Sequence, residues 1–264
     1  MPTNLMSNST LWLGFNWSTL NKASTLLIAY GALMCLLCVV TYFVSLNDAR
    51  TLREIGVWVK PMKFMAATAL FAWTTVWVAH VASTSVVNSA SYQWICGLII
   101  ATSLFEVVYI TYQGSQGAAS HYNTSDPLHA LLFGVMGLAA VGLTASQAWL
   151  AWEIWKDQSA AGFSVFKMAA VIGLVLTFLL ATVSGFLLGG HQPPAGVGLP
   201  ILGWHLYQDI RPSHFLGVHA QQLIPILGLL AERYGGQYAT LGLMFGSASY
   251  VAAWAFLTWA AFAA

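Results

Sequence analysis

Long apolar runs separated by short polar stretches dominate the sequence. Seven runs are about 20 residues or longer and nearly free of charge, which is the length that an α-helix needs to cross a bilayer. The pattern therefore predicts an all-α fold, a polytopic membrane bundle of about seven transmembrane helices. We expect the spans at Ser24–Leu46, Pro61–Thr84, Tyr92–Gln113, Pro127–Trp152, Val165–Leu188, Pro212–Arg233 and Tyr238–Phe262.

Prolines mark the starts of several predicted spans. Asp126 can cap a helix that has Pro127 at its first position, and Pro212 and Pro61 have the same place in two other spans. Pro225 lies inside the sixth span, where we expect a kink.

The chain is predicted to be one transmembrane domain, residues 1–264. Residues 1–23 lack the features of a signal peptide and are expected to lie at the membrane interface, anchored by Trp12, Phe15 and Trp17. Residues 189–211 form a long loop with little charge, which we expect to fold back as a lid. The apolar residues behind the lid prediction are Leu199, Ile201, Leu202 and Trp204.

Composition supports the membrane assignment and limits the partners. Hydrophobic residues make up 58% of the 264 positions and charged residues only 6%, and mean hydropathy is +0.72. Soluble domains carry about 25% charged residues. The net charge of +1 gives no basic footprint for nucleic acid. Expected partners are membrane lipid, a lipophilic small molecule, and a second copy of the chain or the other subunits of a membrane complex.

Seven spans sort the loops onto two faces of the membrane. Face A carries the loops near residues 47–60, 114–126 and 189–211, and face B carries the N-terminus and the other loops. Six of the seven histidines belong to face A, and His80 lies toward face B. The face-A histidines are His121, His129, His191, His205, His214 and His219.

Glu106 is the leading functional candidate, because an ionisable residue inside a span is costly and usually faces a partner in the bundle interior. It belongs to a predicted helical stripe of Thr102, Glu106, Tyr109 and Gln113. We expect Lys63 and His219 to be its partners, with Lys63 supplying positive charge. The alternatives are that Glu106 forms a purely structural ion pair or is a neutral acid.

The face-A histidines suggest a bound haem b or transition metal, because imidazole binds iron, copper and zinc. His214 and His219 are five residues apart, about 140° around a helix, so they are poorly placed to share one metal. Ligands would come from different helices, for example His129 and His219. Further candidate ligands are His121, His205 and His214, and Gln222, Tyr109 and Arg211 are expected nearby. The alternatives are solvated loop residues and hydrogen bonds between helices.

Four blocks resemble those of a family of bacterial multi-pass membrane proteins with no assigned activity. They are WVKPMKF at 58–64, QGSQGAASHYN at 113–123, GLPILGW at 198–204 and RPSHFLGVHAQQLIPILG at 211–228. The blocks extend from the second span to the sixth, and all four belong to face A. The resemblance implies a bacterial membrane protein and assigns no residue a role.

Three functions fit these observations. The first is a membrane-embedded haem or metal site, an oxidoreductase acting on a lipophilic substrate or a carrier such as a quinone, with Glu106 as proton acceptor or donor. The second is a proton-coupled carrier in which Pro225 marks a discontinuous helix. The third is an accessory subunit of a membrane complex.

Basic residues give a small preference for orientation in the bacterial inner membrane. Face A has five of them and face B four. If Lys60 and Lys63 serve the site, the remaining balance places face B inside and the polar site on the extracytoplasmic side.

Overall fold

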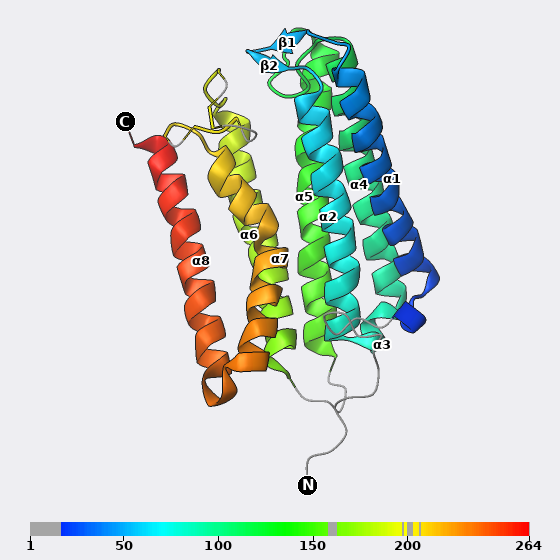
Figure 1. Ribbon diagram of the computed structural model, residues 1–264, viewed down its shortest axis with the longest axis vertical. Helices are drawn as coiled ribbons and strands as arrows, with labels where there is room; N and C mark the ends of the chain where they lie inside the picture. Colours follow the sequence, from blue (N-terminus) through cyan, green and yellow to red (C-terminus); the bar gives the residue numbers. More distant parts are fainter. Residues whose placement is uncertain (1–16, 158–162, 197, 200–202, 206, 264) are drawn as a thin grey trace.

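The structure is a computed structural model that describes residues 17–157, 163–196, 198–199, 203–205 and 207–263. Within these residues, seven helices are long and apolar enough to cross a membrane. They are α1 (Lys22–Ser45), α2 (Val59–Ala82), α4 (Ala90–Ser115), α5 (Pro127–Lys156), α6 (Val165–Gly190), α7 (Arg211–Tyr234) and α8 (Ala239–Phe262). The predicted all-α bundle of seven spans is confirmed (Figure 1).

Capping side chains explain where several of the spans begin. α5 starts at Pro127 as predicted, and Asp126 Oδ1 accepts hydrogen bonds from the backbone N–H groups of Leu128 and His129 at 2.9 and 3.0 Å. These bonds satisfy amide groups that have no partner within the helix. Asn21, Ser89 and Ser164 cap α1, α4 and α6 in the same way.

Short elements that the hydrophobic pattern did not predict connect the spans. They are η1 (Trp17–Thr19), β1 (Thr51–Leu52), β2 (Ile55–Gly56), α3 (Thr84–Val87) and η2 (Gly236–Tyr238). β1 and β2 form an antiparallel hairpin at face A. Its two turn residues, Arg53 and Glu54, have φ angles of 53° and 69°, a combination typical of a type I′ turn. Arg53 Nη2 donates a hydrogen bond of 2.6 Å to the carbonyl of Pro193 in the 191–210 loop.

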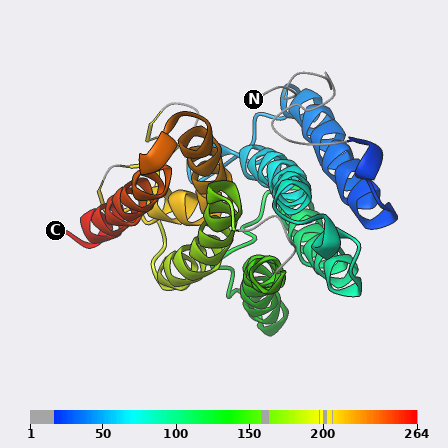
Figure 2. The ribbon, with the colours of Figure 1, turned by 90° about the horizontal axis from the view of Figure 1, so that it is seen from below.

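The helices form two groups. α1, α2, α4 and α5 pack on one side, α6, α7 and α8 on the other, and the contact between α5 and α6 is the most extensive link (Figures 1 and 2). The larger core joins the first group to α6, with Leu27, Tyr92 and Leu174 among its buried residues. A smaller core, which includes Ala220 and Leu243, joins α6, α7 and α8.

Small residues allow α6 and α7 to pack closely. A Cβ atom added at Gly217 would lie 2.7 Å from the backbone nitrogen of Ala181, and one at Gly173 would lie 2.9 Å from the carbonyl oxygen of Ala220. Glycine is common where membrane helices approach this closely. Lipid is as apolar as the helices, so they associate through dispersion contacts between closely packed backbones.

Of three further expectations, one changes with the structure and two fall partly outside the described residues. α7 continues as an unbroken helix through Pro225, so the discontinuous helix expected of a carrier is not seen. Residues 1–16 of the predicted interfacial segment lie outside the described residues, and Trp17 is exposed. Part of the predicted lid also lies outside them, including Ile201 and Leu202.

Candidate functional site

Glu106 lies on α4, facing α1 and α2, with 8% of its surface exposed. It is nine residues before the end of α4 at Ser115, about 14 Å along the helix axis. Lys60, in the first turn of α2, lies within electrostatic range of its carboxylate, and no salt bridge or hydrogen bond joins the two side chains among the described residues. Tyr30 of α1 lies close enough for an electrostatic interaction, and its hydroxyl is 2.8 Å from Ser103 Oγ. Glu106 is thus a buried carboxylate among polar groups from three helices.

Lys60 connects Glu106 to the loop between α4 and α5. Its Nζ donates hydrogen bonds of 2.9 Å to Ser120 Oγ and 2.9 Å to His121 Nδ1. An ammonium group can only donate, so Nδ1 accepts and the imidazole proton is on Nε2. Burial, with the charges of Lys60 and His214, lowers the pKa of His121 to about 3. His121 is therefore neutral at physiological pH.

His214 is the residue that the second helix group contributes near His121. It lies in the first turn of α7, where its Nδ1 is 3.1 Å from Ser184 Oγ of α6. It is also close enough to His121 to act on it electrostatically. We name Glu106, Lys60, Ser120, His121 and His214 the polar cluster. Its residues come from both helix groups and converge toward face A.

The predicted stripe on α4 is present. Glu106, Tyr109 and Gln113 are buried, and Gln113 Nε2 donates a hydrogen bond of 3.0 Å to the Tyr109 hydroxyl. Thr102 is half-buried and donates to the carbonyl of Leu98 in its own helix at 2.8 Å. The stripe thus presents polar groups to the bundle interior over more than two turns.

The expected partners of Glu106 have other neighbours. The side chain of Lys63 is exposed, and the charge near it is that of Arg211. His219 Nδ1 lies 3.2 Å from Gln222 Oε1, and its ring packs against Phe215 with a centroid separation of 4.0 Å. In the part of the chain that the structure describes, neither a hydrogen bond nor an ion pair joins His219 to Glu106. The lysine beside Glu106 is Lys60, one turn nearer face A.

Asp209 and Arg211 organise the start of α7. Arg211 donates through Nε and Nη2 to both carboxylate oxygens of Asp209 at 2.7–3.0 Å, and the amide of His205 donates to Asp209 Oδ2 at 2.8 Å. Burial opposes ionisation, yet these bonds together lower the pKa of the Asp209 carboxyl. The pair fixes the end of the 191–210 loop against α7.

Of the proposed metal ligands, His121 and His214 lie near each other in the polar cluster, whereas His129 and His219 have other neighbours. His129 Nδ1 lies 2.5 Å from Asp126 Oδ2 on the partly exposed first turn of α5, while His219 is bonded to Gln222. His205 Nε2 is buried and has no hydrogen-bond partner among the described residues. Over the same residues, no three His, Cys, Asp or Glu side chains form a group that could hold a metal ion. The described residues therefore contain no three-ligand metal centre, and a haem b or metal site stays a prediction.

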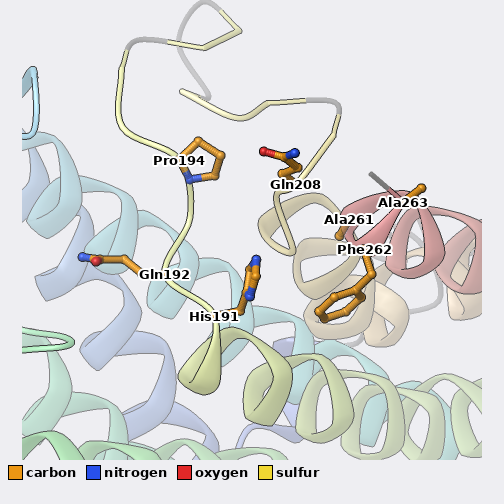
Figure 3. A pocket seen from close by; sticks show the side chains of 7 residues that line it. All are labelled: His191, Gln192, Pro194, Gln208, Ala261, Phe262 and Ala263. Atoms are coloured by element: carbon orange, nitrogen blue, oxygen red, sulfur yellow. The ribbon is translucent and has the colours of Figure 1, made fainter.

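An open hollow of about 410 Å³ lies elsewhere on face A, between the 191–210 loop and the end of α8 (Figure 3). It is lined by His191, Gln192, Pro194, Gln208 and residues 261–263. The His191 ring faces Phe262 at a centroid distance of 5.5 Å. No member of the polar cluster lines it, and we assign the site to the cluster because that is where buried charges meet.

Sequence reasoning missed a smaller polar group at face B. His80 Nε2 lies 2.8 Å from Ser24 Oγ, which donates a hydrogen bond of 3.2 Å to the Tyr92 hydroxyl. His80 Nδ1 is 3.3 Å from Thr19 Oγ1. The signal in the sequence was a histidine and a serine at the same end of two adjacent spans. Neutral hydrogen bonds between helices are sufficient to explain this group.

No protein-family model matches the chain, and neither a curated protein nor a solved structure shows significant similarity to it.

Proposed function

We propose that this membrane protein exchanges a proton with a lipophilic small molecule at face A, and that the polar cluster is the site. Glu106 is the proton acceptor or donor. Lys60 stabilises the charged carboxylate, and His121 links the pair to the loop at face A. The observation that carries the proposal is the position of Lys60, within electrostatic range of a buried carboxylate and hydrogen-bonded to a half-buried neutral imidazole.

The free-energy cost of burying Glu106 and Lys60 supports a functional role for them. A buried ion pair seldom adds stability over apolar residues of the same size, because desolvation offsets the attraction. Ionisable side chains inside spans are therefore usually tied to the movement of protons, ions or substrates. Glu106 and Lys60 are on different helices, so their approach depends on the packing of α2 against α4.

The depth of Glu106 favours a lipophilic ligand. The carboxylate is about 14 Å from the end of α4, well within the apolar part of the bundle. A molecule that reaches it can come from the bilayer between the helices. A quinone fits this description, because its reduction requires protons.

Infrared difference spectroscopy between acid and alkaline pH, on protein in lipid nanodiscs, tests the proton exchange. We expect a pH-dependent band of a protonated carboxyl group that disappears in Glu106→Gln and moves in Lys60→Met. Glu54→Gln, which removes an exposed carboxylate at face A, is the matched control and should leave this band unchanged. A band that persists in Glu106→Gln would contradict the proposal.

A short-chain benzoquinone is the first ligand to try in the same samples. Binding near the carboxyl group should shift the Glu106 band and should have no effect in Glu106→Gln. If the band stays in place at saturating probe, a quinone is not the ligand.

We further propose that the protein resides in the inner membrane of a bacterium, with face A on the extracytoplasmic side. The resemblance of the four sequence blocks supports the first part. The second rests on the basic residues that remain when Lys60 and Lys63 at the start of α2 are both left out of the count, three on face A against four on face B.

A further inference from the structure

An aromatic stack adjoins a buried carboxamide on the first half of α7, outside the polar cluster. The Phe215 ring contacts two others, with centroid separations of 5.1 Å to Trp204 of the 191–210 loop and 4.0 Å to His219. His219 Nδ1 is 3.2 Å from Gln222 Oε1. These four side chains form one continuous set of contacts, which we name the ring group.

Gln222 has an unused hydrogen-bond donor. Only 8% of its surface is exposed, and its Nε2 atom is buried with no hydrogen-bond partner among the described residues. Such a donor is costly, and buried polar atoms in native proteins nearly always have a partner. A carboxamide oxygen can only accept, so His219 donates through Nδ1, and in the neutral ring Nε2 is an acceptor. The ring group therefore offers a donor and an acceptor beside an aromatic face.

Gln222 lies on the side of α7 that faces the first helix group. Val218 and Leu229 pack against the larger core, and Gln222 follows Val218 by four residues and precedes Leu229 by seven, so the three share that side. Gln222 is eleven residues after Arg211 at the start of α7, about 16 Å along the helix axis. The Glu106 carboxylate lies at a comparable depth below face A, so a ligand held by Gln222 would be level with it.

The side of α2 that turns toward the second helix group is covered near face B and open nearer face A. Leu70 and Trp77 are seven residues apart, so they lie on one side of α2. Trp77 packs edge-on against Phe166 of α6 at a centroid separation of 5.6 Å, whereas Leu70 is 44% exposed and Phe215 of α7 is 41% exposed. α2 and α7 both begin at face A and contact each other (Figure 1). A lipophilic molecule can therefore approach the ring group from the bilayer.

We propose that the ring group binds the ring of a lipophilic molecule that carries a carbonyl oxygen. Gln222 Nε2 donates to this oxygen, and the ring packs on Phe215 and His219, since aromatic rings favour offset and tilted contacts. A mostly apolar site with a few convergent polar groups is the usual form of a small-molecule site. The choice of a quinone as this molecule rests on the proposed function, whereas the ring site rests on the contacts described above.

Isothermal titration calorimetry of the full-length protein in lipid nanodiscs tests the ring site. The probe is the short-chain benzoquinone, and its heat in empty nanodiscs is subtracted. We expect Gln222→Met to weaken binding about five-fold or more through loss of one buried hydrogen bond, and Phe215→Leu to weaken it by a similar factor through loss of a ring contact. Gln237→Met and Phe245→Leu, which change exposed residues near face B, are the matched controls.

The outcomes separate the ring site from the proton exchange. Weaker binding in Gln222→Met and Phe215→Leu, with wild-type affinity in the two controls, supports the ring site. If the probe then leaves the Glu106 infrared band in place, the ring site stands and proton exchange with the bound ring is contradicted. No binding to the wild type, or equal affinity in all variants, would overturn the ring site even if the Glu106 band responds to pH. The Phe215 ring is partly exposed, so Phe215→Leu is expected to fold normally and decides the question should Gln222→Met lose stability.

Discussion

Lys60 is the residue on which the candidate site depends. It interacts with the Glu106 carboxylate on one side and donates to Ser120 and His121 on the other. Removing only one member of a buried pair leaves a charge with no compensation, whereas removing both leaves none. This difference makes the pairing measurable.

Lys60→Met should lower the free energy of unfolding in detergent by about 3 kcal/mol. Combining it with Glu106→Gln should recover at least about 1 kcal/mol of that loss, because the double variant no longer has a carboxylate without a nearby cation. Denaturant titrations of the two single variants and the double variant give the coupling directly. Lys63→Met is the control from the same helix and should change stability little. Strict additivity of the Lys60 and Glu106 effects would show that the two side chains do not interact.

His121 should make the protein less stable in acid. Its ordinary pKa is about 6.5, whereas in the folded protein burial and the charges of Lys60 and His214 lower its pKa to about 3. Between these values the unfolded chain binds a proton that the folded chain does not. The stabilisation is complete above about pH 6.5 and is lost as the pH falls toward 3, amounting to about 2 kcal/mol by pH 5.

The measurement is the midpoint of thermal unfolding at pH 7 and pH 5. His121→Gln should show a smaller drop between the two pH values than the wild type. His191→Gln, which removes an exposed histidine from the same face, should behave like the wild type. Equal drops in all three proteins would count against the neutral state of His121.

Glu106 stood out in the sequence, but its partner did not. A carboxylate in an apolar run is conspicuous whatever surrounds it. Lys60 and Lys63 are three residues apart at the start of one helix, and the rotation of α2 about its axis decides which of them faces α4. That rotation follows from packing against α1 and α4, which the spacing of charges does not encode. The contacts of His129 with Asp126 and of His219 with Gln222, by contrast, join residues three apart in the sequence and are independent of helix rotation.

At the scale of elements, the contact between α6 and α7 holds the second helix group together. Gly217 and Gly173 bring the two backbones close enough that a methyl group would meet backbone atoms. Apolar length, with Pro212 near the start of α7, was sufficient to predict where these helices run. The hairpin of β1 and β2 was not predictable in this way, because its strands have two residues each and show no periodicity.

Gly217→Ala should destabilise the protein by about 1–3 kcal/mol. The new Cβ would lie 2.7 Å from Ala181 N, and a backbone atom cannot move aside as a flexible side chain can. Gly137→Ala on α5 places its Cβ in open space and serves as the matched control. Unfolding midpoints in the same detergent compare the two. A loss of similar size in both variants would show that helix propensity, and not the contact between α6 and α7, sets the effect.

For the whole molecule, seven spans place the start of α1 and the end of α8 at opposite faces (Figure 1). The polar cluster forms where the two helix groups meet at face A, with His121 from one group and His214 from the other. Its location therefore depends on the complete bundle and could not be predicted from any single segment.

Labelling of single cysteines in intact bacterial cells tests the orientation. Ser125 is exposed in the face-A loop between α4 and α5, and Gln237 is exposed in the face-B turn before α8. In a background without the three native cysteines, Ser125→Cys should react with a membrane-impermeant maleimide in intact cells. Gln237→Cys should react only after permeabilisation. The reverse pattern would place the polar site in the cytoplasm.

The turn of the hairpin has a consequence for how this protein would respond to engineering. Arg53 and Glu54 both adopt left-handed backbone conformations, which asparagine and glycine adopt at lower cost. Arg53 also holds the 191–210 loop through the Pro193 carbonyl. Replacing the two residues with Asn-Gly would relax the turn and release the loop at the same time. Selection for thermal tolerance alone would favour that exchange, whereas a need to hold the loop in place would oppose it.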